Sequence, residues 1–174
     1  EPTGQVKLLE YERRYFDVMT MHFGDRFLRY RDDWSKSSEF SLTPGFPLSL
    51  DLEVNPSCNL HCVMCVLGGR SRRSANDASL MDPGLYRNLM DQARAAGTPA
   101  MTFGFLSEPL LNPDLADMIR LARNAGIMDI RLGTNGLLRT PDLSQQLIEA
   151  GLTRLEVSLD ALTPETYARI RRGG

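Results

Sequence analysis

Residues 48–65 read LSLDLEVNPSCNLHCVMC, a short alternating segment that runs directly into the three cysteines of the chain. From Leu48 to Val54, apolar residues alternate with acidic or polar ones, which is the period of a β-strand. Cys58, Cys62 and Cys65 follow at spacings of three and two residues. One short loop can therefore aim three sulfur atoms at a common point, and the stretch predicts a strand that ends in a metal-binding loop.

The number of cysteines narrows the chemistry of this loop. Three is odd, so a closed disulfide framework explains it poorly, and a structural zinc site normally takes four protein ligands. Three thiolates leave one coordination position free, as a catalytic metal centre requires. A zinc site completed by His61 or by a distant carboxylate stays open as the alternative.

A strand followed by a helix recurs along the rest of the sequence. Helices are predicted to begin at Asp82-Pro83, after residues 112–114, at Thr140-Pro141 and at Thr163-Pro164, where a capping residue stands beside a proline. Glycines at positions 97, 126 and 151 end the first three helices. Further strands are predicted at residues 100–105, 128–132 and 154–159.

Four strand–helix units in series predict an α/β fold with parallel strands and right-handed crossovers. Ligands of such sheets bind beyond the carboxyl ends of the strands. The cysteine loop, Ser107-Glu108-Pro109, residues 133–136 and Ser158-Leu159-Asp160 all follow strands. We therefore expect a binding site along this rim of the sheet.

The first 45 residues differ from the rest, because they show helical periodicity and no strand alternation. Gly24 is expected to divide this segment into two helices. Thr43-Pro44-Gly45-Phe46-Pro47 marks a boundary. The predicted organisation is a helical extension at 1–45 and a core domain at 46–174.

Composition excludes several partners. The net charge is -2, which does not suggest binding to nucleic acid or to an acidic membrane surface. No apolar run reaches the roughly 20 residues of a membrane span, and the N-terminus lacks the features of a secretory signal. Clustered cysteines without such a signal predict metal ligands in a cytoplasmic protein.

A CxxxCxxC motif after the first strand of a β/α series resembles the radical S-adenosylmethionine (SAM) superfamily, over residues 46 to 174. The resemblance implies a partial (β/α) barrel and a [4Fe-4S] cluster on Cys58, Cys62 and Cys65, whose fourth iron binds SAM. An electron then cleaves SAM to methionine and a 5′-deoxyadenosyl radical, which abstracts hydrogen from an unidentified substrate. It also implies oxygen sensitivity, an electron donor such as a flavodoxin or ferredoxin, and a small-molecule or peptide substrate.

The resemblance assigns roles to six further residues. Leu106-Ser107-Glu108-Pro109 resembles the family's Gly-Gly-Glu-Pro segment, with both glycines replaced, and places Glu108 at the SAM amino group. The remaining implied cofactor contacts are Met64 near adenine, Asn135 in the turn after the third strand, Ser158 and Asp160 near the SAM carboxylate and ribose, and Arg171 at the SAM carboxylate.

Simpler structural roles stand beside these assignments. Glu108 could brace its own turn, Ser158 and Asp160 could cap the next helix, and Asn135 could stabilise its turn through side-chain hydrogen bonds. Three arginines after the cysteine loop, Arg70, Arg72 and Arg73, would meet an anionic substrate or partner peptide, or simply lie in a solvated loop.

Length is the main departure from the family pattern, since about four β/α units are present of an expected six. The fourth strand would then be an exposed apolar edge. We expect either that the chain is a fragment of a longer protein, which we favour, or that a partner chain completes the barrel. Two alternative functions remain: a non-catalytic zinc- or cluster-binding module acting through a partner, and a degenerate family member that no longer binds SAM.

Overall fold

The computed structural model describes residues 3–66 and 80–173, and Arg70, Arg72 and Arg73 lie outside these ranges. The chain divides into two compact units, Glu1–Leu48 and Ser49–Gly174. In the described part of the chain, no helix is long and apolar enough to cross a membrane.

The N-terminal unit consists of α1 (Thr3–Phe23) and α2 (Asp25–Ser38). Gly24 separates them with a positive φ of 55°, a conformation that glycine adopts without a steric penalty. Phe27 is fully buried and meets the rings of Tyr15 and Phe16 edge-on. The prediction of two helices divided at Gly24 is confirmed.

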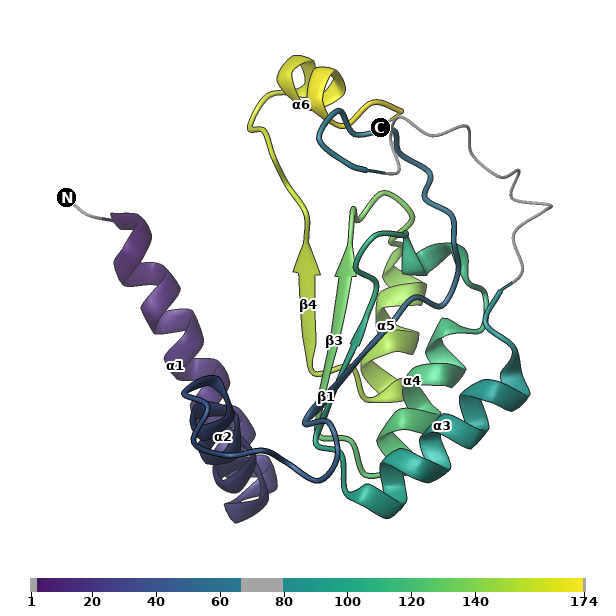
Figure 1. The fold of residues 1–174 in the computed structure, drawn as a ribbon. Coiled ribbons are helices and arrows are strands. Elements are labelled where there is room, and N and C mark those ends of the chain that lie inside the picture. The colour runs from purple at the N-terminus through teal and green to yellow at the C-terminus, as the bar shows by residue number, and fades with distance from the viewer. Residues whose placement is uncertain (1–2, 67–79, 174) are drawn as a thin grey trace. The chain divides into compact units, whose positions relative to one another are not determined.

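The second unit is built on a parallel sheet in the order β1-β2-β3-β4. Its strands are β1 (Ser49–Leu52), β2 (Ala100–Phe103), β3 (Asp129–Thr134) and β4 (Arg154–Val157). The intervening helices are α3 (Pro83–Ala96), α4 (Leu115–Asn124) and α5 (Pro141–Ala150), with α6 (Pro164–Ile170) after β4. Figure 1 shows α3, α4 and α5 covering one face of the sheet. The predicted α/β fold with four parallel units is confirmed.

The hydrophobic core lies between this face and the helices. Met101, Phe103, Ile130 and Leu132 point into it and are at most 1% exposed. Tyr86 of α3 is also buried there, and its hydroxyl donates a hydrogen bond to the Met118 carbonyl of α4 at 2.7 Å. Side chains alternate between the two faces of a strand, so the residues between these core positions face away from the helices.

The carboxyl ends of the strands differ from the predicted ends. β2 stops at Phe103, because Gly104 takes a φ of 81°. β3 continues through Gly133 and Thr134, which pair with Glu156 and Val157 of β4, so the predicted start of the turn at Gly133 is wrong. A short 3-10 helix, η1 (Pro109–Leu111), follows β2 and was not predicted.

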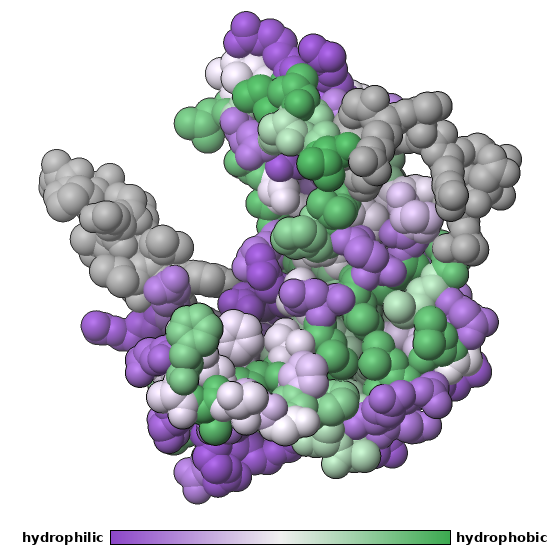
Figure 2. Space-filling model, in the orientation of Figure 1, coloured by the Kyte–Doolittle hydropathy of each residue, from purple (hydrophilic) through white to green (hydrophobic). Residues whose placement is uncertain are grey.

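The fourth strand exposes apolar side chains, as the sequence predicted for an edge. Leu155 and Val157 are 39% and 51% exposed, and Leu159 and Leu162 beyond them are also exposed. Figure 2 shows apolar surface in its upper part, where α6 and the segment leading to it lie.

Candidate cofactor site

A cavity of about 310 Å³ lies at the carboxyl ends of the strands. It collects eight of the nine predicted site residues: Cys58, Cys62, Cys65, Met64, Glu108, Asn135, Ser158 and Arg171. Asp160 is not among the lining residues, but it holds one of them, Arg171. Residues from four separate loops therefore meet at one place, as the rim argument predicted.

Hydrogen bonds hold the cysteine loop in two places, before the first cysteine and between the cysteines. Before the cysteines, Asn55 is buried, accepts a hydrogen bond from the Ser57 amide at 2.7 Å and donates to the Glu108 carbonyl at 2.8 Å. Between them, the amides of His61 and Val63 donate to the carbonyls of Arg172 and Ile170, at 2.7 and 2.9 Å. The end of α6 therefore holds the middle of the loop, a connection that the sequence did not predict.

The three cysteines are free thiols that line one cavity. Burial raises the pKa of Cys62; the Arg171 guanidinium lowers it, and the neighbouring Cys58 and Cys65 raise it. Thiolates that line one cavity repel one another, so a bound cation would stabilise the deprotonated forms and release protons on binding.

The donor set suits an iron–sulfur cluster better than a single ion. Within residues 3–66 and 80–173, no three His, Cys, Asp or Glu side chains are close enough to hold one metal ion. A zinc ion needs every sulfur ligand about 2.3 Å from one atom. In a cluster each cysteine binds a different iron, so the three sulfurs need not reach one atom, and three cysteines that line one cavity fit it. Soft thiolate ligands suit the same group.

Glu108 is an internal brace of the rim. Its side chain is 1% exposed. Its carboxylate accepts hydrogen bonds from the Thr134 hydroxyl at 2.6 Å, the Asn135 amide at 2.8 Å and the Leu110 amide at 3.2 Å. The carboxylate thus connects the loop after β2 to the end of β3. This agrees with the structural alternative that Glu108 braces its own turn. Its contact with SAM stays a prediction.

Asn135 has both local and distant contacts. Its side-chain oxygen accepts a hydrogen bond from the Leu137 amide at 3.0 Å, which stabilises its own turn. Its amide nitrogen donates to Asn59 at 2.7 Å and lies 3.9 Å from the Cys58 sulfur. The turn after β3 therefore reaches the cysteine loop directly, and Asn135 is placed to orient the Cys58 sulfur.

Asp160, before α6, and Arg171, at the C-terminal end of α6, form an ion pair with Nε 2.6 Å from Oδ2. The arginine side chain is 12% exposed, and the pair holds it toward the cavity. Thr163 caps α6 by accepting from the Thr166 amide, so the alternative that Ser158 and Asp160 cap this helix is wrong. The Ser158 amide instead donates to the Thr134 carbonyl at 2.8 Å.

Glu53, at the end of β1, is a site residue that the sequence analysis missed. Its carboxylate accepts from the amides of Phe105 at 2.8 Å, Leu106 at 2.5 Å and Ser107 at 3.2 Å, and from the Ser107 hydroxyl. Successive amides that converge on one point form a nest for an anion. Glu53 fills this nest, and so holds the segment that replaces the family's two glycines.

Glu53→Gln is expected to weaken SAM binding about tenfold while leaving the iron content unchanged. The variant places an amide NH2 against backbone donors and loses charge-assisted hydrogen bonds, each of which contributes about 1.5–3 kcal/mol at most. Calorimetric titration of the cluster-loaded variant with SAM measures the change. Asp51→Asn, an exposed carboxylate on the same strand, is the control. Equal SAM affinity in Glu53→Gln and wild type would show that the nest does not shape the site.

Gly104→Ala is expected to destabilise the fold by about 2–4 kcal/mol. A Cβ at Gly104 would lie 2.2 Å from Pro109 Cγ and 2.9 Å from the Gly133 carbonyl oxygen, at a φ of 81°. Gly97→Ala is the matched control, because Gly97 has a φ of 71° and no neighbour within 4 Å. It should cost only about 1 kcal/mol, the strain at a positive φ. Urea unfolding compares the two, and equal costs would contradict the close packing at Gly104.

Comparison with known proteins identifies the superfamily. The model of the radical SAM superfamily matches residues 52–174. A probable GTP 3′,8-cyclase of Methanococcus maripaludis is 36% identical over 126 residues, which cover 72% of this chain and 41% of that protein. An AdoMet-dependent heme synthase of Methanosarcina barkeri is 31% identical over 125 residues, covering 72% of this chain and 34% of that protein.

Solved structures share the fold. A crystal structure of BtrN in complex with AdoMet and 2-DOIA superposes with a TM-score of 0.61 at 26% identity, covering 74% of this chain and 52% of that one. Streptococcus suis SuiB bound to S-adenosylmethionine superposes with a TM-score of 0.59 at 20% identity, covering 83% of this chain and 32% of that one. The chain thus spans about two fifths of the length of the GTP 3′,8-cyclase that it matches.

Proposed function

The chain belongs to the radical SAM superfamily, and we propose that Cys58, Cys62 and Cys65 bind its [4Fe-4S] cluster and that the cavity beside them binds SAM. Membership in this family implies both cofactors. The observation that carries the residue assignment is the meeting of three free thiols with polar side chains from three other loops in one cavity.

When bound, the cluster would supply the electron for cleavage of SAM to methionine and a 5′-deoxyadenosyl radical, the species that would abstract hydrogen from a substrate. The chain's own residues position and enclose these partners. The thiolates provide soft ligands, and Asn135 orients Cys58 through its side-chain amide. The backbone bonds from the loop to α6 keep Cys62 buried and limit the access of water.

Polar groups of the cavity match the functional groups of SAM. Arg171 offers a cation to the carboxylate, Ser158 offers a hydroxyl to the ribose or carboxylate, and Met64 offers an apolar, half-exposed side chain to the adenine. Asp160 acts by holding Arg171.

Glu108 retains the capacity to accept from the SAM ammonium. An ionised carboxylate has about four acceptor positions, and the carboxylate of Glu108 uses three of them for Thr134, Asn135 and Leu110. One acceptor position remains, and Glu108 is among the residues that line the cavity. This supports a double role, in which the residue that braces the rim also receives the ammonium.

The relatives share the cofactor-binding part and differ in their substrates, since their names include a GTP cyclase and a heme synthase. They therefore select no single substrate for this chain, and a small molecule and a peptide both remain candidates. A small reduced electron carrier, such as a flavodoxin or ferredoxin, is the proposed electron donor.

Elemental analysis after anaerobic reconstitution with iron and sulfide tests the metal assignment. About four iron and four sulfide atoms per chain are expected. One zinc per chain with no iron would instead support a non-catalytic module acting through a partner. A full cluster with no calorimetric signal for SAM would identify a degenerate family member.

A further inference from the structure

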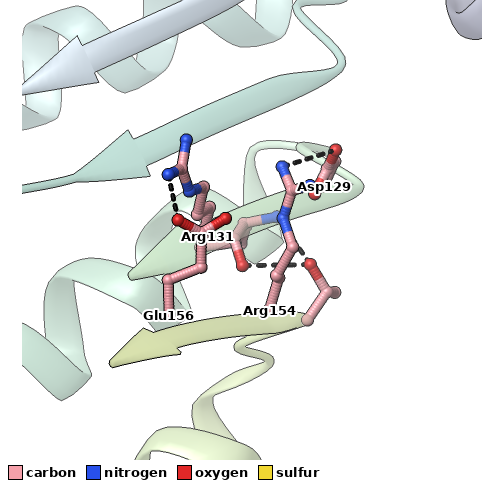
Figure 3. Close-up of polar contacts among 6 residues, drawn as sticks. Asp129, Arg131, Arg154 and Glu156 are labelled. Carbon is pink, nitrogen blue, oxygen red and sulfur yellow. Dashed lines mark hydrogen bonds and ion pairs between the residues drawn. The ribbon is translucent and has the colours of Figure 1, made fainter. Parts of the chain in front are cut away.

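The face of β3 and β4 that points away from the helices is charged. Asp129 and Arg131 alternate on β3 with the fully buried Ile130 and Leu132, and Arg154 and Glu156 lie on β4 (Figure 3). The interior of a β/α barrel is normally filled by bulky apolar side chains. A charged interior face is therefore a poor packing surface and suits a space that receives a polar ligand.

The four charges form two ion pairs in different surroundings. Arg131 donates to Glu156, and both side chains line the cavity that contains the cysteines. Arg154 lies 3.7 Å from Asp129, and neither of these residues lines the cavity. Register explains the difference, because Glu156 stands beside Gly133 at the carboxyl end of the sheet, whereas Asp129 lies toward the amino end.

Arg131 and Glu156 are the charged side chains that β3 and β4 contribute to the lining of the cavity. Gly104 and Gly133 line the same cavity and contribute no side chain to it. Both side chains of the pair remain partly open, with 38% exposure for Arg131 and 45% for Glu156. A molecule that enters beside the cysteines can therefore reach this pair.

The guanidinium of Arg131 has unused donors. Nη2 donates to Glu156, but Nε is buried and has no hydrogen-bond partner among the residues that the structure describes. A buried donor without an acceptor is destabilising, so Arg131 has a hydrogen-bonding capacity that the described residues leave unused. A guanidinium presents its N–H groups as a planar fork that matches a carboxylate or a phosphate.

From this geometry we propose that Arg131 recognises an oxyanion of the substrate, a carboxylate or a phosphate, and that Glu156 occupies the guanidinium until that group arrives. The inference rests on the proposed function, because it assigns the substrate end of the same cavity. The SAM carboxylate is assigned above to a different cation, Arg171, which Asp160 holds toward the same cavity.

Two substitutions with opposite expected effects test this proposal. Inorganic phosphate and acetate are the probes, titrated separately into the cluster-loaded, SAM-bound protein and followed by phosphorus and carbon NMR. Arg131→Gln should weaken the tighter-binding probe at least about tenfold, the loss of one charge-assisted contact. Glu156→Gln should tighten it severalfold, because the competing carboxylate is gone. The identity of the tighter probe tells phosphate from carboxylate.

Arg120→Gln is the control, because Arg120 is also paired with a carboxylate, Asp117, but lies on the outer surface of α4. It should leave the affinity unchanged. The proposal is overturned if wild type binds neither probe or if Arg131→Gln does not change probe affinity. It is also overturned if Arg131→Gln and Glu156→Gln both weaken probe binding, which is the result expected if the ion pair only stabilises the structure. It is also overturned if Arg131→Gln lowers SAM affinity and spares the probes.

The same titrations in the cluster-free protein separate this proposal from the proposed function. Failure of cluster assembly contradicts the cofactor assignment. Weaker probe binding in Arg131→Gln together with tighter probe binding in Glu156→Gln would still support the oxyanion site. A normal cluster and normal SAM binding, without these changes in probe affinity, would contradict the oxyanion site and leave the cofactor assignment intact.

Discussion

Cys62→Ala is expected to remove the cluster and, with it, all SAM cleavage. Cys62 is the most buried of the three cysteines, and the loop around it is held by two backbone hydrogen bonds to the end of α6. The chain has no fourth cysteine to replace it. Iron in the reconstituted variant should fall from about four atoms per chain to less than about one.

His61→Ala is the matched control for this experiment. His61 is exposed and adjacent to Cys62, and its contact with α6 uses the backbone amide, which alanine retains. This variant should assemble a full cluster. A full cluster in Cys62→Ala would contradict the assignment, as would equal loss of iron in both variants.

Glu108→Ala is expected to lower the free energy of unfolding by about 3–5 kcal/mol, the range for removing one partner from a buried charged network. The substitution leaves the Thr134 hydroxyl and the Asn135 amide without their acceptor, and both residues are buried. It also disconnects the loop after β2 from the end of β3. Urea unfolding of the cluster-free protein measures the effect.

Glu108→Gln separates charge from shape. It keeps one acceptor and most of the volume, so it should cost about 1–3 kcal/mol, the penalty of one mismatched buried hydrogen bond. Glu149→Ala removes an exposed carboxylate on α5 and should cost less than about 0.5 kcal/mol. If Glu108→Ala cost less than about 1 kcal/mol, its carboxylate would not be the brace described above.

The helices were predictable because their signals are local. Asp82 accepts from the Leu85 amide at 2.7 Å, and Thr140 and Thr163 cap α5 and α6 in the same way. Gly97 and Gly151 end their helices in the left-handed conformation, as a glycine after a helix indicates. In each case the cap and its partner are only a few residues apart.

The ends of the strands were less predictable, because pairing with a neighbouring strand sets them. Gly133 and Thr134 read as a turn, yet β4 extends β3 through both of them. The sequence shows that both glycines before Glu108 are replaced, but not what holds the altered segment. Glu53, more than 50 residues earlier, holds the altered segment. No local pattern distinguishes such a glutamate from an ordinary surface acid.

The cysteines could be found from their spacing, whereas the Arg131–Glu156 pair could not. Arg131 and Glu156 are 25 residues apart, and their meeting depends on the register of β3 against β4. The rim of the sheet is recognisable from the sequence, because a polar motif follows each strand there. The inner face below the rim has alternating charges that, in sequence, resemble an exposed strand.

Formation of 5′-deoxyadenosine is the most direct measurement of the central claim. The reconstituted protein is incubated anaerobically with SAM and dithionite, and the products are separated by chromatography. We predict 5′-deoxyadenosine and methionine in equal amounts, dependent on the reductant and absent in Cys62→Ala. A protein with about four iron atoms per chain and bound SAM that forms no 5′-deoxyadenosine above the dithionite-free control would contradict this account.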